Sequence, residues 1–404
     1  MKNTWWLFIT QAITKVLSLL FIVYLGRSLS IGDFGKFNLA NAISLIFAVC
    51  VDYGFNIYLV REIAKDKTKI GSLLGSIIPF KIILGVLVFA SVYFTVVFIN
   101  YDPVTETVIM LMALYYILFS FSIFFRTIFI AYEMMEYESI FSLIDKILVF
   151  VMVIFVVFNK KGVVEIALVY VFVEAIMLIS SVYLLLKKFP DIKYVFSKSI
   201  LITSIKESSY FFLSNILLML YLYLDSIMLS KMKGEEAVGL YNASYNLVYN
   251  LRFLISPLIT SLFPSMAFNA QNDKNELLIT HKKTGRLLLI SGIIVTIICF
   301  VLSKQIIILL YGYKFIDSVY AFAILIWAIP FIFVNGFYSY LLTSLNHQKN
   351  ILLYLTFAVI LDVLLNILVI PKYGFIGASF ATVISEILYF VLCFRKLIKL
   401  GFKQ

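Results

Sequence analysis

Long apolar segments separated by short polar clusters run along the whole chain. Twelve of them have the length of a bilayer-crossing helix, about 20 residues, and they lie at residues 5–25, 37–60, 74–99, 106–131, 139–158, 163–186, 208–230, 238–264, 285–303, 318–343, 350–370 and 375–395. Segments such as residues 82–99 are apolar on every face, whereas the strands of a membrane barrel alternate apolar and polar positions. The pattern therefore predicts an all-α integral membrane protein with about 12 transmembrane helices.

The composition leads to the same class of protein. Apolar residues make up 63% of the 404 residues and charged residues only 14%, against about 45–50% and about 25% in soluble domains. The three cysteines, Cys50, Cys299 and Cys393, fall inside predicted spans, so no disulfide framework is expected. The first span contains Lys15 and ends without a small-residue cleavage site, so we expect an uncleaved first helix rather than a signal peptide.

The distribution of lysine and arginine predicts the orientation. Nineteen of the 33 basic residues lie in segments that face one side of the membrane, and nine lie in segments that face the other. Since basic residues concentrate on the cytoplasmic side, both termini are predicted to be cytoplasmic. The net charge of +11 then reflects topology and the anionic lipid of the inner leaflet, so we expect no nucleic-acid partner.

The chain also shows signs of an internal repeat. Residues 34–38 (FGKFN) and 238–242 (VGLYN) each open the second helix of a half, at an offset of 204 residues in a chain of 404. We therefore predict a six-helix N-terminal bundle over residues 1–186, a basic cytoplasmic linker over 187–207 and a six-helix C-terminal bundle over 208–404. Many secondary transporters have this layout, with the substrate path between the halves.

Several motifs resemble those of a known family of transporters. They are residues 25–37 (LGRSLSIGDFGKF), 52–56 (DYGFN) and 59–66 (LVREIAKD), followed by 225–229 (DSIML), 238–241 (VGLY), 371–378 (PKYGFIGA) and 381–382 (AT). These motifs resemble bacterial polysaccharide flippases that translocate O-antigen repeat units, a branch of the multidrug/oligosaccharidyl-lipid/polysaccharide exporter superfamily. The resemblance covers essentially the whole chain. It implies alternating-access translocation of undecaprenyl-pyrophosphate-linked oligosaccharide from the cytoplasmic to the outer face of the bacterial inner membrane.

The resemblance also implies the partners of the chain. They are the undecaprenyl-pyrophosphate-linked oligosaccharide, the lipid bilayer, and a polysaccharide polymerase with a chain-length regulator. No cofactor and no metal are expected, because the two histidines, His281 and His347, lie in separate predicted loops without a ligand cluster. No Gly-rich phosphate loop is present either, and every predicted outer loop is too short to carry catalytic groups. We therefore expect that the chain is not an enzyme.

Charged residues inside the spans are the candidate functional residues. Each costs about 2.5–3.5 kcal/mol at a helix centre on insertion scales, so such residues usually face a cavity or a partner. Eleven fall there, namely Lys15, Lys81, Arg126, Lys146, Arg252, Asp52, Asp145, Glu174, Asp225, Asp362 and Glu386. The implied substrate carries an anionic pyrophosphate, which arginine binds through two parallel hydrogen bonds. The predicted substrate-binding residues are Lys15, Arg252, Arg126 and Lys81.

Each of these bases has an alternative role in an intramembrane ion pair, for example Lys15 with Asp52 or Arg252 with Glu386. Three acids near span midpoints are predicted to bind a coupling cation, H⁺ or Na⁺, since a carboxylate in a low-dielectric cavity can take up a proton or coordinate a cation. They are Glu174, Asp362 and Glu386. Neutralisation of nearby bases is their alternative role. Three prolines inside spans, Pro257, Pro264 and Pro330, permit bends that alternating access could use.

Two other functions stay open at this point. A multidrug or cation antiporter of the same superfamily would share the twelve-helix plan, but its cavity should be dominated by acids, and the bases of the first half count against it. A flippase for another lipid-linked glycan, such as a capsular, exopolysaccharide or teichuronic acid unit, fits the sequence as well. A peptidoglycan-precursor flippase typically has more helices than can be placed here.

Overall fold

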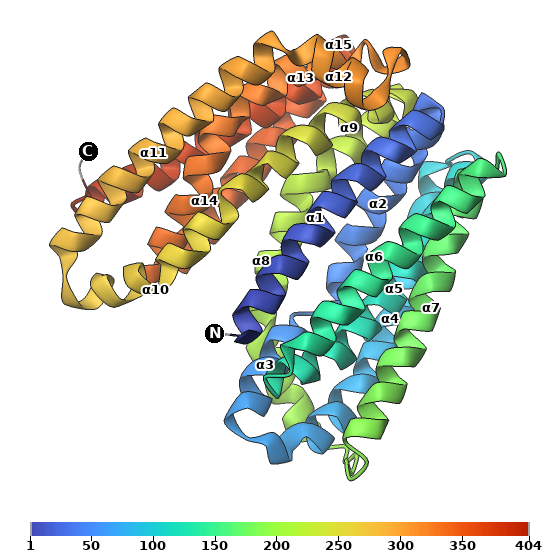
Figure 1. Ribbon diagram of the computed structural model, residues 1–404, viewed down its shortest axis with the longest axis vertical. Helices are drawn as coiled ribbons and strands as arrows, with labels where there is room; N and C mark the ends of the chain where they lie inside the picture. The colour runs from blue at the N-terminus through green and yellow to red at the C-terminus, as the bar shows by residue number, and fades with distance from the viewer. Residues whose placement is uncertain (1, 403–404) are drawn as a thin grey trace. The chain divides into compact units, whose positions relative to one another are not determined.

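The computed structural model describes the backbone of residues 2–402 and the side chains of residue 10 and residues 13–402 (Figure 1). Within that range all regular structure is helical. The α-helices are α1 Lys2–Ser28, α2 Ile31–Asp52, α3 Phe55–Lys65, α4 Ile70–Ile99, α5 Pro103–Ala131, α6 Met135–Phe158, α7 Val163–Lys188, α8 Lys198–Lys233, α9 Glu235–Asn250, α10 Ser256–Asn272, α11 Lys274–Val301, α12 Ser303–Tyr311, α13 Ser318–Leu325, α14 Ile329–Ser344 and α15 Gln348–Lys399. Short 3₁₀ turns are η1 Lys67–Lys69, η2 Leu251–Leu254, η3 Tyr313–Phe315 and η4 Ile326–Ala328.

Many of these helices have the length and apolar content of membrane spans. Among the described residues nine qualify, or ten if the bent pair Glu235–Leu254 and Ser256–Asn272 is taken as one span. Every apolar segment that the sequence marks as a span lies mostly in helices. The prediction of an all-helical protein with many spans is therefore confirmed, while the number of twelve and the cytoplasmic termini stay predictions.

Helix α15 is too long for one crossing. Its 52 residues would extend about 78 Å at about 1.5 Å per residue, more than twice the roughly 30 Å of a hydrocarbon core. Gly374 interrupts it with φ 56° and ψ −135°, a conformation that only glycine adopts at low cost. The break falls between the two predicted segments 350–370 and 375–395, and it divides α15 into two helical parts.

Two predicted spans are themselves interrupted. The segment 37–60 breaks between α2 and α3, where Tyr53 and Gly54 have positive φ values of 49° and 79°. A Cβ at Gly54 would lie 2.7 Å from the Cβ of Phe211 and 2.9 Å from the carbonyl oxygen of Ser208, so the close passage of α8 also requires glycine. The segment 238–264 breaks at η2, directly before the α10 helix that begins with Ser256 and Pro257.

The chain divides into two compact units. Unit 1 comprises Met1–Leu29 and Lys36–Met219, and unit 2 comprises Ser30–Gly35 and Leu220–Gln404. Helix α8 begins at Lys198, inside the segment predicted as a linker, and its first part belongs to unit 1. The predicted division into residues 1–186, 187–207 and 208–404 stays a prediction.

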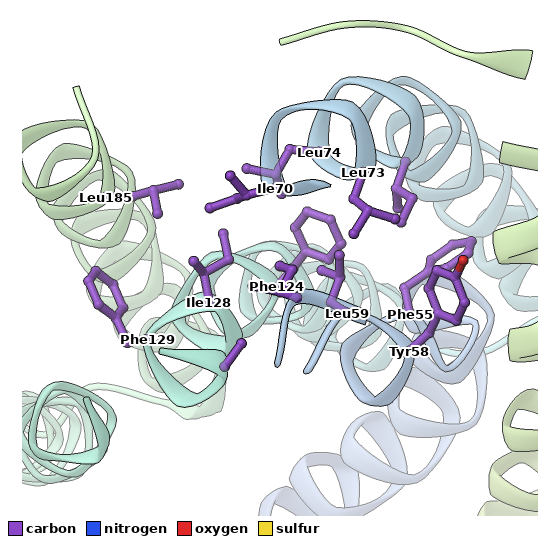
Figure 2. Packing of buried hydrophobic residues seen from close by; sticks show 13 residues of the cluster. Phe55, Tyr58, Leu59, Ile70, Leu73, Leu74, Phe124, Ile128, Phe129 and Leu185 are labelled. Atoms are coloured by element: carbon purple, nitrogen blue, oxygen red, sulfur yellow. The ribbon is translucent and has the colours of Figure 1, made fainter. Parts of the chain in front are cut away.

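Unit 1 has an apolar core at one end of its helices (Figure 2). Leu59 of α3, Leu74 of α4, Phe124 of α5 and Leu185 of α7 are all at most 1% exposed and belong to one cluster. These side chains come from four helices that are apart in the sequence. Burial of each large apolar side chain contributes roughly 1.5–3 kcal/mol, so the cluster fixes how the four helices meet.

Unit 2 has its own packing. Helix α11 packs on α14, α14 on α15, and α13 on α9. The first turn of α2 also belongs to it, because Phe34 is fully buried with its ring centroid 5.9 Å from that of Tyr311 and 5.6 Å from that of Phe315. Helix α2 therefore starts in unit 2 and continues in unit 1.

Candidate functional site

Lys81 of α4 lies fully enclosed in unit 1. Its Nζ donates to the carbonyl oxygen of Val51 at 3.0 Å and to the hydroxyl of Ser120 at 2.7 Å. It also lies 5.3 Å from the ring centroids of both Phe121 and Phe124. Because the Val51 carbonyl is near the end of α2, the ammonium joins the end of that helix to α4 and α5.

Arg126 of α5 is buried as well, and it has an acidic partner. Its Nε lies 3.3 Å from Oε2 of Glu138 in α6, and its guanidinium lies 5.8 Å from the ring centroid of Phe141. On the same helix as Glu138, Asp145 contacts its neighbour Lys146 with an Nζ to Oδ2 distance of 3.4 Å. Both pairs lie within unit 1 and leave little net charge there.

Glu174 of α7 is a buried acid without a fixed partner. Only 1% of it is exposed, and neither carboxylate oxygen has a hydrogen-bond partner among the described residues. An ionised carboxylate is energetically costly when it is buried and its two oxygens accept no hydrogen bond. The site can therefore take up a proton or a small cation.

The two remaining predicted anion contacts are accessible. Lys15 is exposed on α1. Arg252 is only partly buried, and it lies in η2, the break between α9 and α10, where the two helices bend by 43°. Its Nη1 donates to the hydroxyl of Tyr249 at 2.8 Å, which leaves further guanidinium N–H groups available. Broken spans with polar groups at the break are a common form of substrate site in transporters.

Within unit 2, a row of tyrosines runs along α9 from the end next to Arg252. Tyr241, Tyr245 and Tyr249 recur every four residues, so they share one helix face. Their rings stack with centroid distances of 5.3 Å and 5.6 Å. The hydroxyl of Tyr241, at the far end of the row, donates to Oδ2 of Asp225 at 2.5 Å.

Asp225 belongs to a buried carboxylate pair in unit 2. The amide nitrogen of Asn366 donates to Oδ1 of Asp225 at 2.6 Å and to Oδ2 of Asp362 at 3.1 Å. Thr382 donates to Asp225 at 2.9 Å, and Ser385 donates to Asp362 at 3.1 Å. Two carboxylates on one amide repel each other unless a proton or cation joins them, and the oxygens around them are the ligand type that hard cations prefer.

Glu386 lies near this pair, one turn of helix beyond Thr382. Its Oε2 accepts from the amide of Asn335 at 2.7 Å. Glu386, Asp225 and Asp362 line a small cavity together with Tyr221, Tyr245, Tyr249, Thr382, Ser385 and four apolar residues. The space open to the centre of a water-sized sphere is about 10 Å³, which is room for about one water molecule or a bare cation.

Of the alternative ion pairs, only that of Arg126 occurs in the described part of the chain, with Glu138. Lys15 has no ion pair with Asp52, and Arg252 has none with Glu386. No group of three or more His, Cys, Asp or Glu residues within residues 2–402 could hold a metal ion. The carboxylate pair could hold only a weakly bound ion, with amide and hydroxyl groups completing the shell.

Sequence reasoning placed Asp362 and Glu386 in this site but missed Asp225 and Asn366 as site residues. The spacing of Asp362 and Asn366, four residues apart on one helix face, was a usable signal. The contact from Asp225 to Asn366 spans 141 residues, and no local pattern reveals it.

Comparison with known proteins places the chain in a family. The family model described as "Polysaccharide biosynthesis protein" matches residues 1–270, which is more than half of the chain. A curated relative is an uncharacterized membrane protein of Methanocaldococcus jannaschii, with 24% identity over 92% of this chain and 79% of the relative.

Two solved structures show the fold. One, titled as the lipid II flippase MurJ in an inward closed conformation, has a TM-score of 0.78 and 15% identity, and it covers 97% of this chain and 87% of that chain. The other is an inward-facing multidrug resistance MATE family transporter of the MOP superfamily, with a TM-score of 0.75 and 13% identity over 96% of this chain and 95% of that chain. The chain thus has the same fold as these two structures. With the family match over residues 1–270, this multi-pass membrane protein belongs to the polysaccharide biosynthesis protein family.

Proposed function

We propose that this transporter moves an undecaprenyl-pyrophosphate-linked oligosaccharide, of the O-antigen or a related repeat-unit class, across the bacterial cytoplasmic membrane by alternating access. Twelve crossings with both termini in the cytoplasm complete the proposal. They comprise the nine helices that qualify among the described residues, the bent pair, helix α1 and the second part of α15. The family match and the likeness to a flippase of another lipid-linked saccharide support the substrate class.

The observation that carries the proposal is the position of Arg252. An accessible guanidinium at membrane depth is costly unless it binds something. Arg252 has one neutral hydrogen-bond partner, Tyr249, and no ion pair among the described residues. Its remaining donors fit the paired oxygens of a phosphate. Arg252 lies in the 3₁₀ turn η2, at the bend between α9 and α10.

Lys15, exposed on α1, provides a second cation as a point charge. Lys81 and Arg126 have a different part in the proposal. They are enclosed and already bonded to Val51, Ser120 and Glu138, so they stabilise the bundle of unit 1 and set its charge balance rather than contact the substrate in this conformation.

Cation coupling forms the second half of the proposal. The Asp225–Asp362 pair, bridged by Asn366, binds H⁺ or Na⁺, and Tyr241 links the pair to the tyrosine row that ends near Arg252. Glu174 in unit 1 and Glu386 in unit 2 are further cation-binding candidates. Occupation of the pair removes its repulsion and changes how firmly α8, α9 and α15 hold together.

The proposal is tested in a strain that lacks this chain. We expect single lipid-linked repeat units to accumulate with their sugars inaccessible to a membrane-impermeant probe, and restoration of the gene to reverse this. Normal outward glycan in the deletion strain would contradict a flippase function.

Variants of Arg252 test the site within that assay. Arg252→Gln removes the charge but keeps hydrogen-bonding capacity, and we expect translocation to fall about tenfold or more, because a hydrogen bond to a charged group contributes about 1.5–3 kcal/mol. Arg286→Gln, at an exposed arginine of α11 in the same unit, is the matched control and should keep full activity. Equal activity of the two variants would remove Arg252 from the site.

The coupling half has its own test. Asp225→Asn and Asp362→Asn should each abolish the dependence of transport on the Na⁺ or proton gradient, whereas Asp317→Asn, at an exposed aspartate of unit 2, should leave it unchanged. Retained gradient dependence in both pair variants would contradict coupling at this pair while leaving the flippase assignment intact.

A second candidate function is export of organic cations. It is favoured by one observation, the three acids and three tyrosines that line the cavity of unit 2, since carboxylates and aromatic faces both attract cations. The deletion strain distinguishes the two functions. Unchanged glycan with increased sensitivity to cationic drugs would establish the antiporter.

A further inference from the structure

A second cavity opens in unit 1, far along the chain from the carboxylate pair. It has a volume of about 490 Å³, within the roughly 300–1,000 Å³ typical of ligand pockets. Its walls come from η1 and the start of α4, from Tyr132 between α5 and α6, and from the end of α7 with the segment 189–195 that follows. The cavity thus lies where three spans reach the end of the apolar region.

Three lysines from different elements line this cavity. Lys67 comes from η1, Lys188 from the end of α7 and Lys193 from the following segment. All three are exposed, and none has an ion pair among the described residues. Only one acid, Asp191, is among the lining residues, so the cavity carries a surplus of positive charge.

Asp66, the acid that precedes Lys67 in the sequence, is already engaged. Asp66 accepts from the backbone N–H of Thr68 at 3.0 Å and from its hydroxyl at 2.6 Å. Lys69 approaches the other oxygen of Asp66 at 3.9 Å. Asp66 is therefore committed to the turn before α4, and it does not neutralise the cavity lysines.

The floor of the cavity is apolar and aromatic. Ile70, which is 7% exposed, and the partly buried Phe189 and Ile192 connect it to the core cluster of unit 1 (Figure 2). The ring of Tyr132 lies 4.6 Å from that of Phe189, centroid to centroid. The Nζ of Lys67 lies 5.1 Å from the Tyr132 centroid, a cation–π contact that holds one lysine over the cavity.

The segment after α7 is fastened to α4, so the third wall is fixed in place. Val195 donates its N–H to the carbonyl oxygen of Gly71 at 3.3 Å, and Ser197 donates to the hydroxyl of Ser76 at 3.0 Å. A Cβ at Gly75 would lie 2.7 Å from both N and O of Val195, so small residues on α4 allow this approach. Lys193 is thereby held beside Lys67 rather than on a free loop.

We infer that this cavity binds the phosphate headgroup of an anionic phospholipid. Three lysines without an ion pair supply the charge for a phosphate, although the Nζ of Lys188 also lies 5.4 Å from the ring centroid of Tyr137. The aromatic floor suits the boundary between headgroup and acyl chains, and basic cavities at the ends of membrane helices bind such headgroups. A bound headgroup would join η1, the α5–α6 turn and the segment after α7. The inference does not depend on which glycan the protein transports.

The test measures binding with soluble lipids. Purified full-length protein in detergent is titrated with dihexanoyl phosphatidylglycerol, dihexanoyl phosphatidylcholine or inorganic phosphate, and the unfolding temperature is followed, since a ligand of the folded state raises it. We expect a saturable rise with phosphatidylglycerol only. An equal rise with phosphatidylcholine would overturn the inference, and an equal rise with inorganic phosphate would reassign the cavity to free phosphate.

Variants locate the binding. The triple variant K67Q/K188Q/K193Q should need about tenfold or more phosphatidylglycerol for the same shift, whereas the triple Lys→Arg variant keeps the charge and should match the wild type. K160Q/K161Q, at exposed lysines of the α6–α7 turn, is the matched control and should also match it. If the triple variant does not fold, K193Q alone should weaken binding about fivefold. An unchanged titration in the glutamine variants would overturn the inference.

Discussion

Buried charges are the residues that most distinguish this chain from a passive helical bundle, and their surroundings differ. Lys81 is fully bonded inside unit 1, Arg126 is close to Glu138, and Arg252 is left with spare donors. The sequence puts Arg252 near the middle of its span and Lys81 and Arg126 nearer the predicted cytoplasmic ends, but it does not show their partners. Their partners differ: Lys81 and Arg126 are bonded to neighbouring helices, whereas Arg252 bonds to the nearby Tyr249 and is proposed to bind an anion.

Replacement of Lys81 tests the structural role. Lys81→Met keeps the length of the side chain but leaves the Val51 carbonyl and the Ser120 hydroxyl without their donor. We expect a loss of about 1–3 kcal/mol in the free energy of unfolding, the usual cost of an unsatisfied buried polar group. Denaturant unfolding in detergent measures it, with Lys161→Met at an exposed position as control. A gain in stability would contradict this role, because it would show that burying the ammonium costs more free energy than its hydrogen bonds contribute.

Glu174 gives the opposite expectation. Because neither of its oxygens has a partner in the described structure, Glu174→Gln removes a costly charge and breaks no hydrogen bond. The variant should unfold at the same or a higher temperature than the wild type, and transport should lose part of its pH dependence. A clear fall in the unfolding temperature would show that the carboxylate has a stabilising partner and is not a free proton site.

At the scale of elements, the sequence predicted the helices better than the places where they break. The apolar segments predicted the helices, since a continuous apolar run has no other stable form in lipid. Two of the three named prolines follow breaks, Pro257 after η2 and Pro330 after η4, whereas Pro264 lies inside α10. The break at Gly374 falls where the sequence separates two predicted spans. The break at Gly54 was not predicted, because a lone glycine inside an apolar run is also common in unbroken membrane helices.

The two glycine breaks differ in surroundings, which yields a prediction. Gly374 has positive φ, but its nearest neighbour to a new Cβ, the Cγ of Lys233, is 3.9 Å away. Gly374→Ala should therefore cost only the backbone strain, about 1–2 kcal/mol. Gly54→Ala should cost more, because its Cβ would also collide with Phe211 and Ser208.

Unfolding free energies of the two variants are the measurement. Gly162→Ala serves as the reference, since Gly162 has φ −91° and an added Cβ would lie 3.5 Å from a side-chain oxygen of Glu165. The free energy of unfolding should change by no more than about 0.5 kcal/mol. An equal loss of unfolding free energy at Gly54 and Gly374 would contradict the prediction. It would mean that α8, which carries Phe211 and Ser208, moves away from the new Cβ.

For the whole molecule, the sequence predicted an all-helical protein with many spans, which is confirmed, and it predicted less of the site. Asp362 and Glu386 stood out as lone acids in apolar segments. Asp225 became a site residue only through Asn366, which contacts it across 141 residues. Long-range contacts of this kind depend on how whole helices pack, and helix packing is set by many side chains together.

Orientation is a prediction for the whole molecule. In a variant with Cys50, Cys299 and Cys393 replaced, single cysteines at Lys193 and Lys283 should react with an impermeant thiol reagent only after the cytoplasmic face is opened. Cysteines at Lys160 and Lys304 should react in intact cells. Labelling of the first pair from outside would reverse the topology derived from the positive-inside rule.

The contact between the two halves of the repeat has a consequence for ancestry. A Cβ at Gly35 would collide with the carbonyl oxygen of Glu235, and a Cβ at Gly239 would collide with that of Ile31. Both pairs are related by the same offset of 204 residues, so the contact is reciprocal, as a twofold axis makes it in a symmetric dimer. An ancestral protein of half this length could have formed a symmetric dimer, with the glycine motif of each copy packed against the other copy. Duplication and fusion of its gene would then have placed both motifs in one chain.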